Sequence, residues 1–198
     1  MFGGSTASAQ TIGDSAYNAT FPLQTGIQSV IGQSVSPPSG RLDSYTLYLR
    51  RNTATLSVIP FVYEWTGDPQ PYPTTVVWTG APVSVTATAI TPVTFTTGGV
   101  VLDPAKIYVL AVRLANPAET GTYGQNEAGT YAPGSRVFGN TTTLNGGGVS
   151  VRDLPFSATF TPTVPAPVPT LSEWAMILLG LTLAGAAVLI VQQRRLSA

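Results

Sequence analysis

The sequence contains no cysteine and no histidine. Their absence excludes disulfide bonds, thiolate metal sites, cysteine nucleophiles and any serine–histidine–aspartate triad. Side-chain packing and β-ladder hydrogen bonds must therefore hold the fold together.

Charged residues are also scarce, at 9% of the 198 residues, and nine basic side chains are balanced by nine acidic ones. A protein that binds nucleic acid through its phosphates needs a basic surface, so we expect no nucleic-acid partner. In contrast, 43% of the residues are hydrophobic, with three Trp, eight Tyr and seven Phe. The chain can build a core, and its length suits one domain of ordinary size plus a tail.

Near the C-terminus, residues 175–191 read AMILLGLTLAGAAVLIV and carry no charge. At about 1.5 Å per residue, this run is at the short end of what a bilayer-spanning helix needs. Trp174 precedes it, and Arg194 and Arg195 follow. The pattern predicts a transmembrane helix at about 174–192, with the arginine pair as a cytoplasmic stop. A buried core helix is the alternative, but the segment has no polar face.

A proline-rich linker is predicted at 162–169, immediately before this helix, because four prolines within residues 162–170 favour an extended spacer. A short motif overlaps its end and leads into the helix. Its residues are Val168, Pro169, Thr170, Leu171, Ser172, Glu173 and Trp174.

The order of this motif, the hydrophobic helix and the terminal arginines resembles the bacterial IPTL-CTERM sorting signal, a relative of PEP-CTERM tails. Val168 stands where the family usually has Ile, and Ala175 where Gly commonly follows the Trp. The resemblance identifies 168–198 as a sorting tail. It implies a membrane-anchored inner-membrane precursor in a Gram-negative bacterium, processing by an exosortase-type protease, and delivery to the cell surface or extracellular matrix. A plain single-pass anchor with an accidental motif is the alternative.

Residues 1–9 are expected to be the remnant of a signal peptide or a disordered Gly/Ser leader. Ala7-Ser8-Ala9 has the small-x-small form of a signal-peptidase site. Nine residues cannot hold both a charged and an apolar region, so we expect the true start to lie upstream and the mature chain to begin at Gln10.

Residues 10–161 read as short strands separated by Gly, Pro, Asn and Asp. We predict an all-β ectodomain, an antiparallel two-sheet sandwich of jelly-roll type, with an immunoglobulin-like sandwich as the alternative. The predicted strands lie at 27–35, 42–50, 57–65, 76–78, 83–89, 93–97, 106–114, 136–138 and 154–160.

Three of these strands carry informative patterns. Residues 42–50 alternate, with Tyr45, Leu47 and Leu49 on one face. Residues 57–65 place aromatic side chains opposite Val58 and Val62. Residues 106–114 are almost continuously apolar, so both faces of that strand should be covered.

The ectodomain also resembles lectin-like jelly-roll modules that often precede such sorting tails. The resemblance rests on IGQS at 31–34, VYEWTG at 62–67, IYVL at 107–110 and DLPF at 153–156. It implies polysaccharide as a ligand.

Aromatic side chains are candidate ligand-binding residues, because the C–H faces of sugar rings stack on them. Tyr72 lies in a stiff proline-rich loop and is expected to be exposed, and Tyr123 and Tyr131 lie in a long Gly-rich segment, 116–135. A plain surface loop or disorder is the alternative for that segment. Trp65 and Trp78 are further candidates, with core positions as the favoured interpretation.

Asp153, at the start of the last strand, is a candidate calcium ligand that could meet Asp14 if the two ends of the domain lie close together. An ordinary aspartate at a strand start is the alternative. Glycoside hydrolysis needs two carboxylates across a cleft. No motif pairs the acidic side chains, which we expect at turns and strand ends: Glu64, Asp68, Asp103, Glu119, Glu127 and Asp153.

The sequence therefore predicts a non-enzymatic, exported cell-surface or matrix protein whose ectodomain binds polysaccharide or a surface partner. No cofactor is required, with calcium as the one candidate. The alternatives are a polysaccharide-active jelly-roll hydrolase or lyase and a self-associating surface-layer protein.

Overall fold

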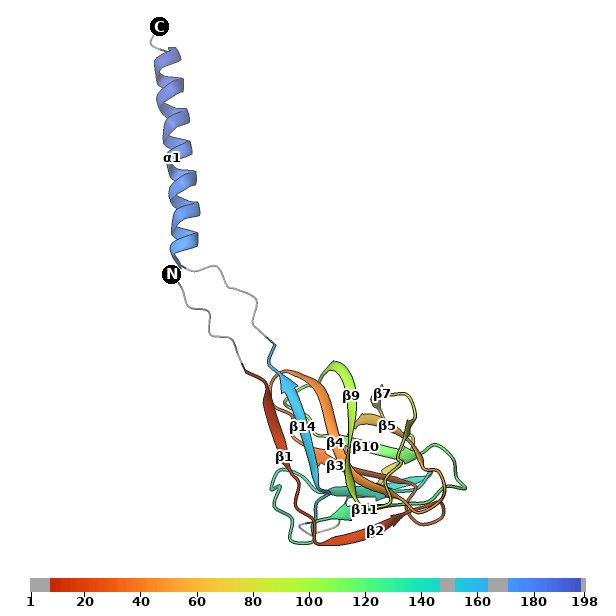
Figure 1. Ribbon diagram of the computed structural model, residues 1–198. Helices are drawn as coiled ribbons and strands as arrows, with labels where there is room; N and C mark the ends of the chain where they lie inside the picture. Colours follow the sequence, from red (N-terminus) through yellow and green to blue (C-terminus); the bar gives the residue numbers. More distant parts are fainter. Residues whose placement is uncertain (1–7, 147–151, 164–170, 197–198) are drawn as a thin grey trace. The chain divides into compact units, whose positions relative to one another are not determined.

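The computed structural model describes residues 8–146, 152–163 and 171–196 (Figure 1). The chain divides into two compact units, Met1–Thr163 and Val164–Ala198. The first contains the strands described below, and the second contains a helix.

The first sheet is built around β4, an 11-residue strand flanked by antiparallel neighbours. The chain's first strand, β1, pairs with its last, β14, and β14 pairs in turn with β4 (Figure 1). On its other side, β4 pairs with β9. The C-terminal end of β4 pairs with β11, and β11 also pairs with β2. The strands are β1 (Gln10–Asp14), β2 (Ala19–Leu23), β4 (Arg41–Arg51), β9 (Thr91–Val101), β11 (Gly121–Gln125) and β14 (Phe156–Thr161).

The second sheet has the strand order β6-β13-β12-β3-β10-β5-β7, with β8 also paired to β5, and its pairs are antiparallel. The strands are β3 (Val30–Val35), β5 (Ser57–Glu64), β6 (Gln70–Pro71), β7 (Val76–Thr79), β8 (Val83–Ser84), β10 (Tyr108–Leu114), β12 (Arg136–Gly139) and β13 (Thr143–Gly146). The predicted antiparallel two-sheet sandwich is therefore confirmed. The jelly-roll type stays a prediction.

The main core lies between the two sheets. Tyr45, Leu47 and Leu49 of β4 are all buried in it, as the alternation of that strand predicts, and they share one cluster with Val62 and Leu110 of the second sheet. Burying this continuous apolar surface supplies most of the driving force for closing the sandwich.

One buried hydroxyl also ties the sheets together. Tyr45 on β4 donates its hydroxyl to the backbone carbonyl of Ala111 on β10, at 2.6 Å. Burial raises the pKa of Tyr45 well above its usual value, so the phenol keeps its proton and remains a donor.

The second sheet also has an apolar outer face. On β10, Leu110 and Val112 enter the main core, whereas Val109 and Ala111 belong to a second buried cluster. The prediction that both faces of 106–114 are covered is thus confirmed for 108–112, whereas Lys106 and Ile107 precede the strand and are exposed. On β5, Phe61 and Tyr63 likewise face the second cluster, while Val58 and Val62 face the first.

The segment that follows β5 helps to cover this outer face. Trp65 and Tyr72 pack against the second cluster, and β6 pairs with β13 at the edge of the same sheet. Because this segment folds back over the sheet, it brings an aromatic side chain to the site described below.

The strand prediction differs from the structure in several places. Residues 83–89 form only the two-residue β8, and β9 is much longer than 93–97. The sequence also missed β1, β2, β6, β11 and β13. In β11 the alternating pattern of a strand is weak, because Gly121 has no side chain. A Cβ there would lie 2.9 Å from the backbone oxygen of Arg50 as well as 2.6 Å from Leu56 Cδ2, so the close approach favours glycine.

Candidate functional site

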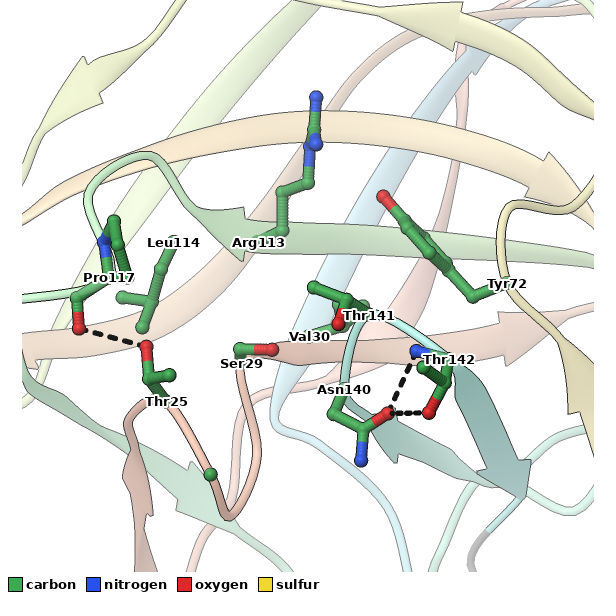
Figure 2. A pocket seen from close by; sticks show the side chains of 11 residues that line it. Thr25, Ser29, Val30, Tyr72, Arg113, Leu114, Pro117, Asn140, Thr141 and Thr142 are labelled. Carbon is green, nitrogen blue, oxygen red and sulfur yellow. Dashed lines mark hydrogen bonds between the residues drawn. The ribbon is translucent and has the colours of Figure 1, made fainter.

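A cavity of about 500 Å³ opens at the end of β10, on the side of the second cluster (Figure 2). This volume lies within the range of about 300–1,000 Å³ typical of small-molecule sites. Three connections form its walls: those between β2 and β3, β10 and β11, and β12 and β13. The lining residues that matter here are Thr25, Tyr72, Arg113, Asn140, Thr141 and Thr142.

The rim of the cavity is held by its own hydrogen bonds (Figure 2). Thr25 donates its hydroxyl to the carbonyl of Pro117 at 2.8 Å, which links two of the walls. In the third wall, Asn140 Oδ1 accepts from the backbone N–H of Thr142 at 2.9 Å and from its hydroxyl at 2.7 Å. This is an Asx-turn, which is why Asn suits the position. The rim is thus organised before any ligand binds.

Tyr72 contributes the aromatic surface of the cavity. Its backbone N–H donates to the carbonyl of Thr142 at 3.1 Å, and its ring meets that of Phe61 edge-on, with centroids 6.4 Å apart. The side chain is half-buried, so the expectation of a freely exposed Tyr72 is corrected. The same packing fixes the ring, which reaches the cavity (Figure 2).

Arg113 contributes the charge. Alternation along β10 places it on the same side as Val109 and Ala111, where the apolar strand ends. Among the described residues, the salt bridges are Lys106–Glu64 at 2.8 Å and Arg152–Glu127 at 3.9 Å, so Arg113 has no acidic partner there. No Asp or Glu lines the cavity either.

Arg113, Asn140 and Thr25 were missed by sequence reasoning. The signal that could have revealed Arg113 is its place as the one charge in the strand YVLAVRL. Asn140 and Thr25 carry no comparable local signal, because their turns meet only in the folded chain.

Tyr123 does not lie in an exposed loop, contrary to prediction. It is 1% exposed, in the middle of β11, and stacks on Phe21 with centroids 6.2 Å apart. Its hydroxyl donates to Gln28 and accepts from Arg136 Nη1 at 3.1 Å. Burial raises the pKa of Tyr123, and the charge of Arg136 opposes that rise. Tyr123 therefore packs inside the sandwich and does not line the cavity.

Arg136 is itself buried beside this tyrosine. Its guanidinium lies over the rings of Phe21 and Phe138, at 5.4 and 4.4 Å from their centroids, and also donates to Gln125. Burial lowers its pKa. Aromatic rings and neutral acceptors solvate this cation, which gives it a structural role in the core.

Tyr131 and Asp153 lie together, away from the cavity lining. Tyr131 is half-buried, with its ring edge-on to Phe156 at 4.9 Å. Its backbone N–H donates to Asp153 Oδ2 at 2.9 Å, and Gln33 Nε2 donates to Asp153 Oδ1 at 2.8 Å. Asp153 is 2% exposed, and this burial raises its pKa, although the donors oppose the rise.

Asp14 and Asp153 lie near each other, as expected, and Asn126 links them. Asn126 forms a β-bridge with Asp153, and its side chain donates to Asp14 Oδ2 at 3.4 Å. Thr130 donates to the same carboxylate oxygen. Both carboxylates therefore already accept hydrogen bonds. In the described ranges, no cluster of three or more His, Cys, Asp or Glu side chains gathers to hold a metal.

Two further carboxylates and two tryptophans hold the fold locally. Glu119 is 8% exposed and accepts from the backbone N–H of Ser57 at 2.6 Å, and Asp103 accepts from that of Ala105 at 2.9 Å. Trp65 and Trp78 are both half-buried against the core clusters, as the favoured interpretation predicts.

The C-terminal unit contains α1 (Leu171–Leu196), a helix of 26 residues. Trp174 is 53% exposed, and the hydroxyl of Thr182 donates to the carbonyl of Leu179 at 2.8 Å. Val168, Pro169 and Thr170 lie outside the described residues, as do the side chains of Leu171, Ser172, Glu173, Arg194 and Arg195. Within the part that is described, no helix is long and apolar enough to cross a membrane, so the transmembrane prediction for 174–192 is not confirmed.

Comparison with known proteins identifies this tail. The IPTL-CTERM motif matches residues 166–195. The motif indicates an exported protein that is anchored at the surface by its C-terminal tail, and it implies membrane association and processing by an exosortase-like machinery. No curated protein matches the chain.

Proposed function

We propose that this chain is a non-enzymatic cell-surface or matrix protein whose sandwich binds extracellular polysaccharide. Its tail would deliver it from an inner-membrane precursor to the surface of a Gram-negative bacterium. The observation that carries the binding proposal is the cavity in which Tyr72 meets a rim of hydroxyl and amide groups.

The chemistry of this cavity suits a saccharide. A sugar ring has apolar C–H faces and a girdle of hydroxyls. The ring face of Tyr72 would pack against the C–H face of the sugar, and the side chains of Asn140 and Thr141 would exchange hydrogen bonds with its hydroxyls. The rim's internal hydrogen bonds lower the entropic cost of binding.

A polysaccharide hydrolase has less support. Hydrolysis of a glycosidic bond needs an acid and a second carboxylate across the scissile bond. The residues that line this cavity include neither Asp nor Glu. A binding role requires no such pair.

The binding proposal is tested by co-sedimenting the whole chain, in neutral detergent, with extracellular polysaccharide from its source cell. We expect wild-type protein to sediment with the polymer and Tyr72→Leu to sediment much less. Leucine keeps the apolar contact with Phe61 but removes the stacking surface. The matched control is Tyr17→Leu, because Tyr17 is 45% exposed and does not line the cavity. The proposal would be contradicted if all three proteins sedimented equally with the polymer, or if none of them did.

The sorting proposal has a separate test. The C-terminus of the protein is mapped by mass spectrometry on material taken from the source cell. A species that ends between residues 168 and 174 is expected from proteolytic sorting. Exclusively full-length chains ending at Ala198 would reduce the tail to a permanent anchor.

The surface-layer alternative is tested by the size distribution of the protein. A layer protein would form large assemblies of the chain alone as concentration rises. We expect instead that the assembly state is independent of protein concentration when polysaccharide is absent.

A further inference from the structure

Arg113 gives the cavity a net positive charge that its other lining residues do not balance. Arg113 is half-buried at the end of β10, and the two salt bridges of the described residues involve other cations. A partly desolvated cation without an acidic neighbour gains most from an anionic ligand.

We propose that the cavity recognises an acidic saccharide, with a uronate carboxylate paired to Arg113. This inference rests on the polysaccharide binding proposed above and names the ligand class. Guanidinium and carboxylate match in shape, because two parallel N–H donors face two oxygens. A neutral sugar would shield the cation from water and return only weaker, uncharged hydrogen bonds.

Two other groups make the ligand a sugar and not merely an anion. The ring of Tyr72 lines the same cavity and offers a face for the apolar side of a pyranose (Figure 2). Asn140 Oδ1 is occupied by the N–H and hydroxyl of Thr142, so the side-chain amide presents its NH₂ group as a donor for sugar hydroxyls. A bare anion such as phosphate would use Arg113 and leave the aromatic surface without a partner.

The experiment measures the affinity of the whole chain, in neutral detergent, for paired oligosaccharides by titration calorimetry. The probes are oligogalacturonate, oligomannuronate and oligoglucuronate, each beside its carboxyl-reduced form, in which –COO⁻ becomes –CH₂OH. We expect at least one acidic probe to bind about tenfold or more tightly than its reduced partner, as one charge-assisted pair would give. This preference should weaken as salt is added.

Arg113→Gln should abolish the preference, because glutamine keeps hydrogen-bonding capacity but lacks the charge. Arg41→Gln is the matched control. Arg41 is exposed on β4 of the other sheet and does not line the cavity, so its loss should leave both affinities unchanged. Thermal unfolding of each variant verifies that the fold is retained.

The outcomes separate this inference from the function on which it rests. If wild type and Arg113→Gln bind acidic and reduced probes equally, the acidic-saccharide proposal fails while polysaccharide binding stands. If no probe binds and source-cell polysaccharide does not sediment with the protein, both fail. Binding of poly-glutamate as tight as that of the uronates would make the ligand an acidic polypeptide and overturn the proposal.

Discussion

Replacing Asp153 by Asn should destabilise the sandwich whether or not calcium is present. The carboxylate accepts from Gln33 Nε2 at 2.8 Å and from the backbone N–H of Tyr131 at 2.9 Å. An asparagine in the same place keeps one oxygen and turns an NH₂ group toward the other donor. Gln33 cannot flip to compensate, because its Oε1 already accepts from the backbone N–H of Leu154 at 2.8 Å.

The size of the effect follows from one broken hydrogen bond. A hydrogen bond to a charged group contributes about 1.5–3 kcal/mol, and a donor left buried without a partner costs a similar amount. Asn also removes the desolvation cost that raises the pKa of Asp153. We therefore expect a net loss of about 1–3 kcal/mol in the free energy of unfolding. For a chain of this size, that corresponds to a fall of roughly 2–12 °C in the unfolding temperature.

The assay is chemical and thermal unfolding of the whole chain in detergent, followed by tryptophan fluorescence, with calcium and with chelator. A structural Asp153 predicts the same loss in both conditions. A calcium ligand predicts that wild type is stabilised by calcium and that Asp153→Asn abolishes this stabilisation. An unfolding temperature equal to that of wild type in both conditions would refute the hydrogen-bond reasoning itself.

Three further predictions concern the same sandwich. Tyr45→Phe removes the hydrogen bond to the carbonyl of Ala111 and should cost about 1–3 kcal/mol in urea unfolding, because that carbonyl stays buried. Gly32→Ala places a Cβ 2.5 Å from Val109 Cγ1 in the central part of the second sheet, and the overpacking should cost about 1–3 kcal/mol by the same measurement. The pKa of Asp153 is raised in the folded state, so the folded protein holds this proton at pH values where the unfolded chain has released it. Its contribution to stability should therefore be lost as pH rises from the usual value of 3.8 through the folded-state pKa, as seen in unfolding at a series of pH values.

Each of these has a control. Tyr48→Phe changes a tyrosine on the opposite face of β4 and should be close to neutral. Gly180→Ala adds a Cβ with no atom within 4 Å and should not destabilise the protein. Asp153→Asn removes the titrating group, so a difference between its pH profile and that of wild type isolates this one residue. If the difference in unfolding free energy between wild type and Asp153→Asn stayed constant across acidic pH, the raised pKa of Asp153 would be contradicted.

Local patterning was sufficient for the strands that carry the core. Alternation placed Tyr45, Leu47 and Leu49 on one buried face, and the continuous apolar run at 106–114 predicted a strand covered on both sides. These patterns predict the buried face correctly, because a strand points successive side chains to opposite faces whichever strands it pairs with. The sorting tail was equally predictable from sequence, because its motif, hydrophobic run and arginines are contiguous in the chain.

The ligand-binding candidates depended on more than pattern. Glycine and polarity suggested an exposed loop around Tyr123, yet β11 pairs with two strands and buries that ring. Composition alone could not distinguish the two cases, because a Gly-rich segment is also what a closely packed strand requires. Tyr131 was predicted as a ligand-binding residue and Asp153 as a calcium ligand. The structure brings the two together, and their contact holds the fold.

The sequence by itself determined the sorting tail, the all-β class and the buried faces of β4, β5 and β10, because each of these is encoded by neighbouring residues. Only the tertiary structure decided which side chains share a cavity. Tyr72, Arg113 and Asn140 come from separate segments, which β-pairing and the return of the chain over the second sheet bring together. That convergence depends on long-range register, to which no single stretch of sequence gives a local signal.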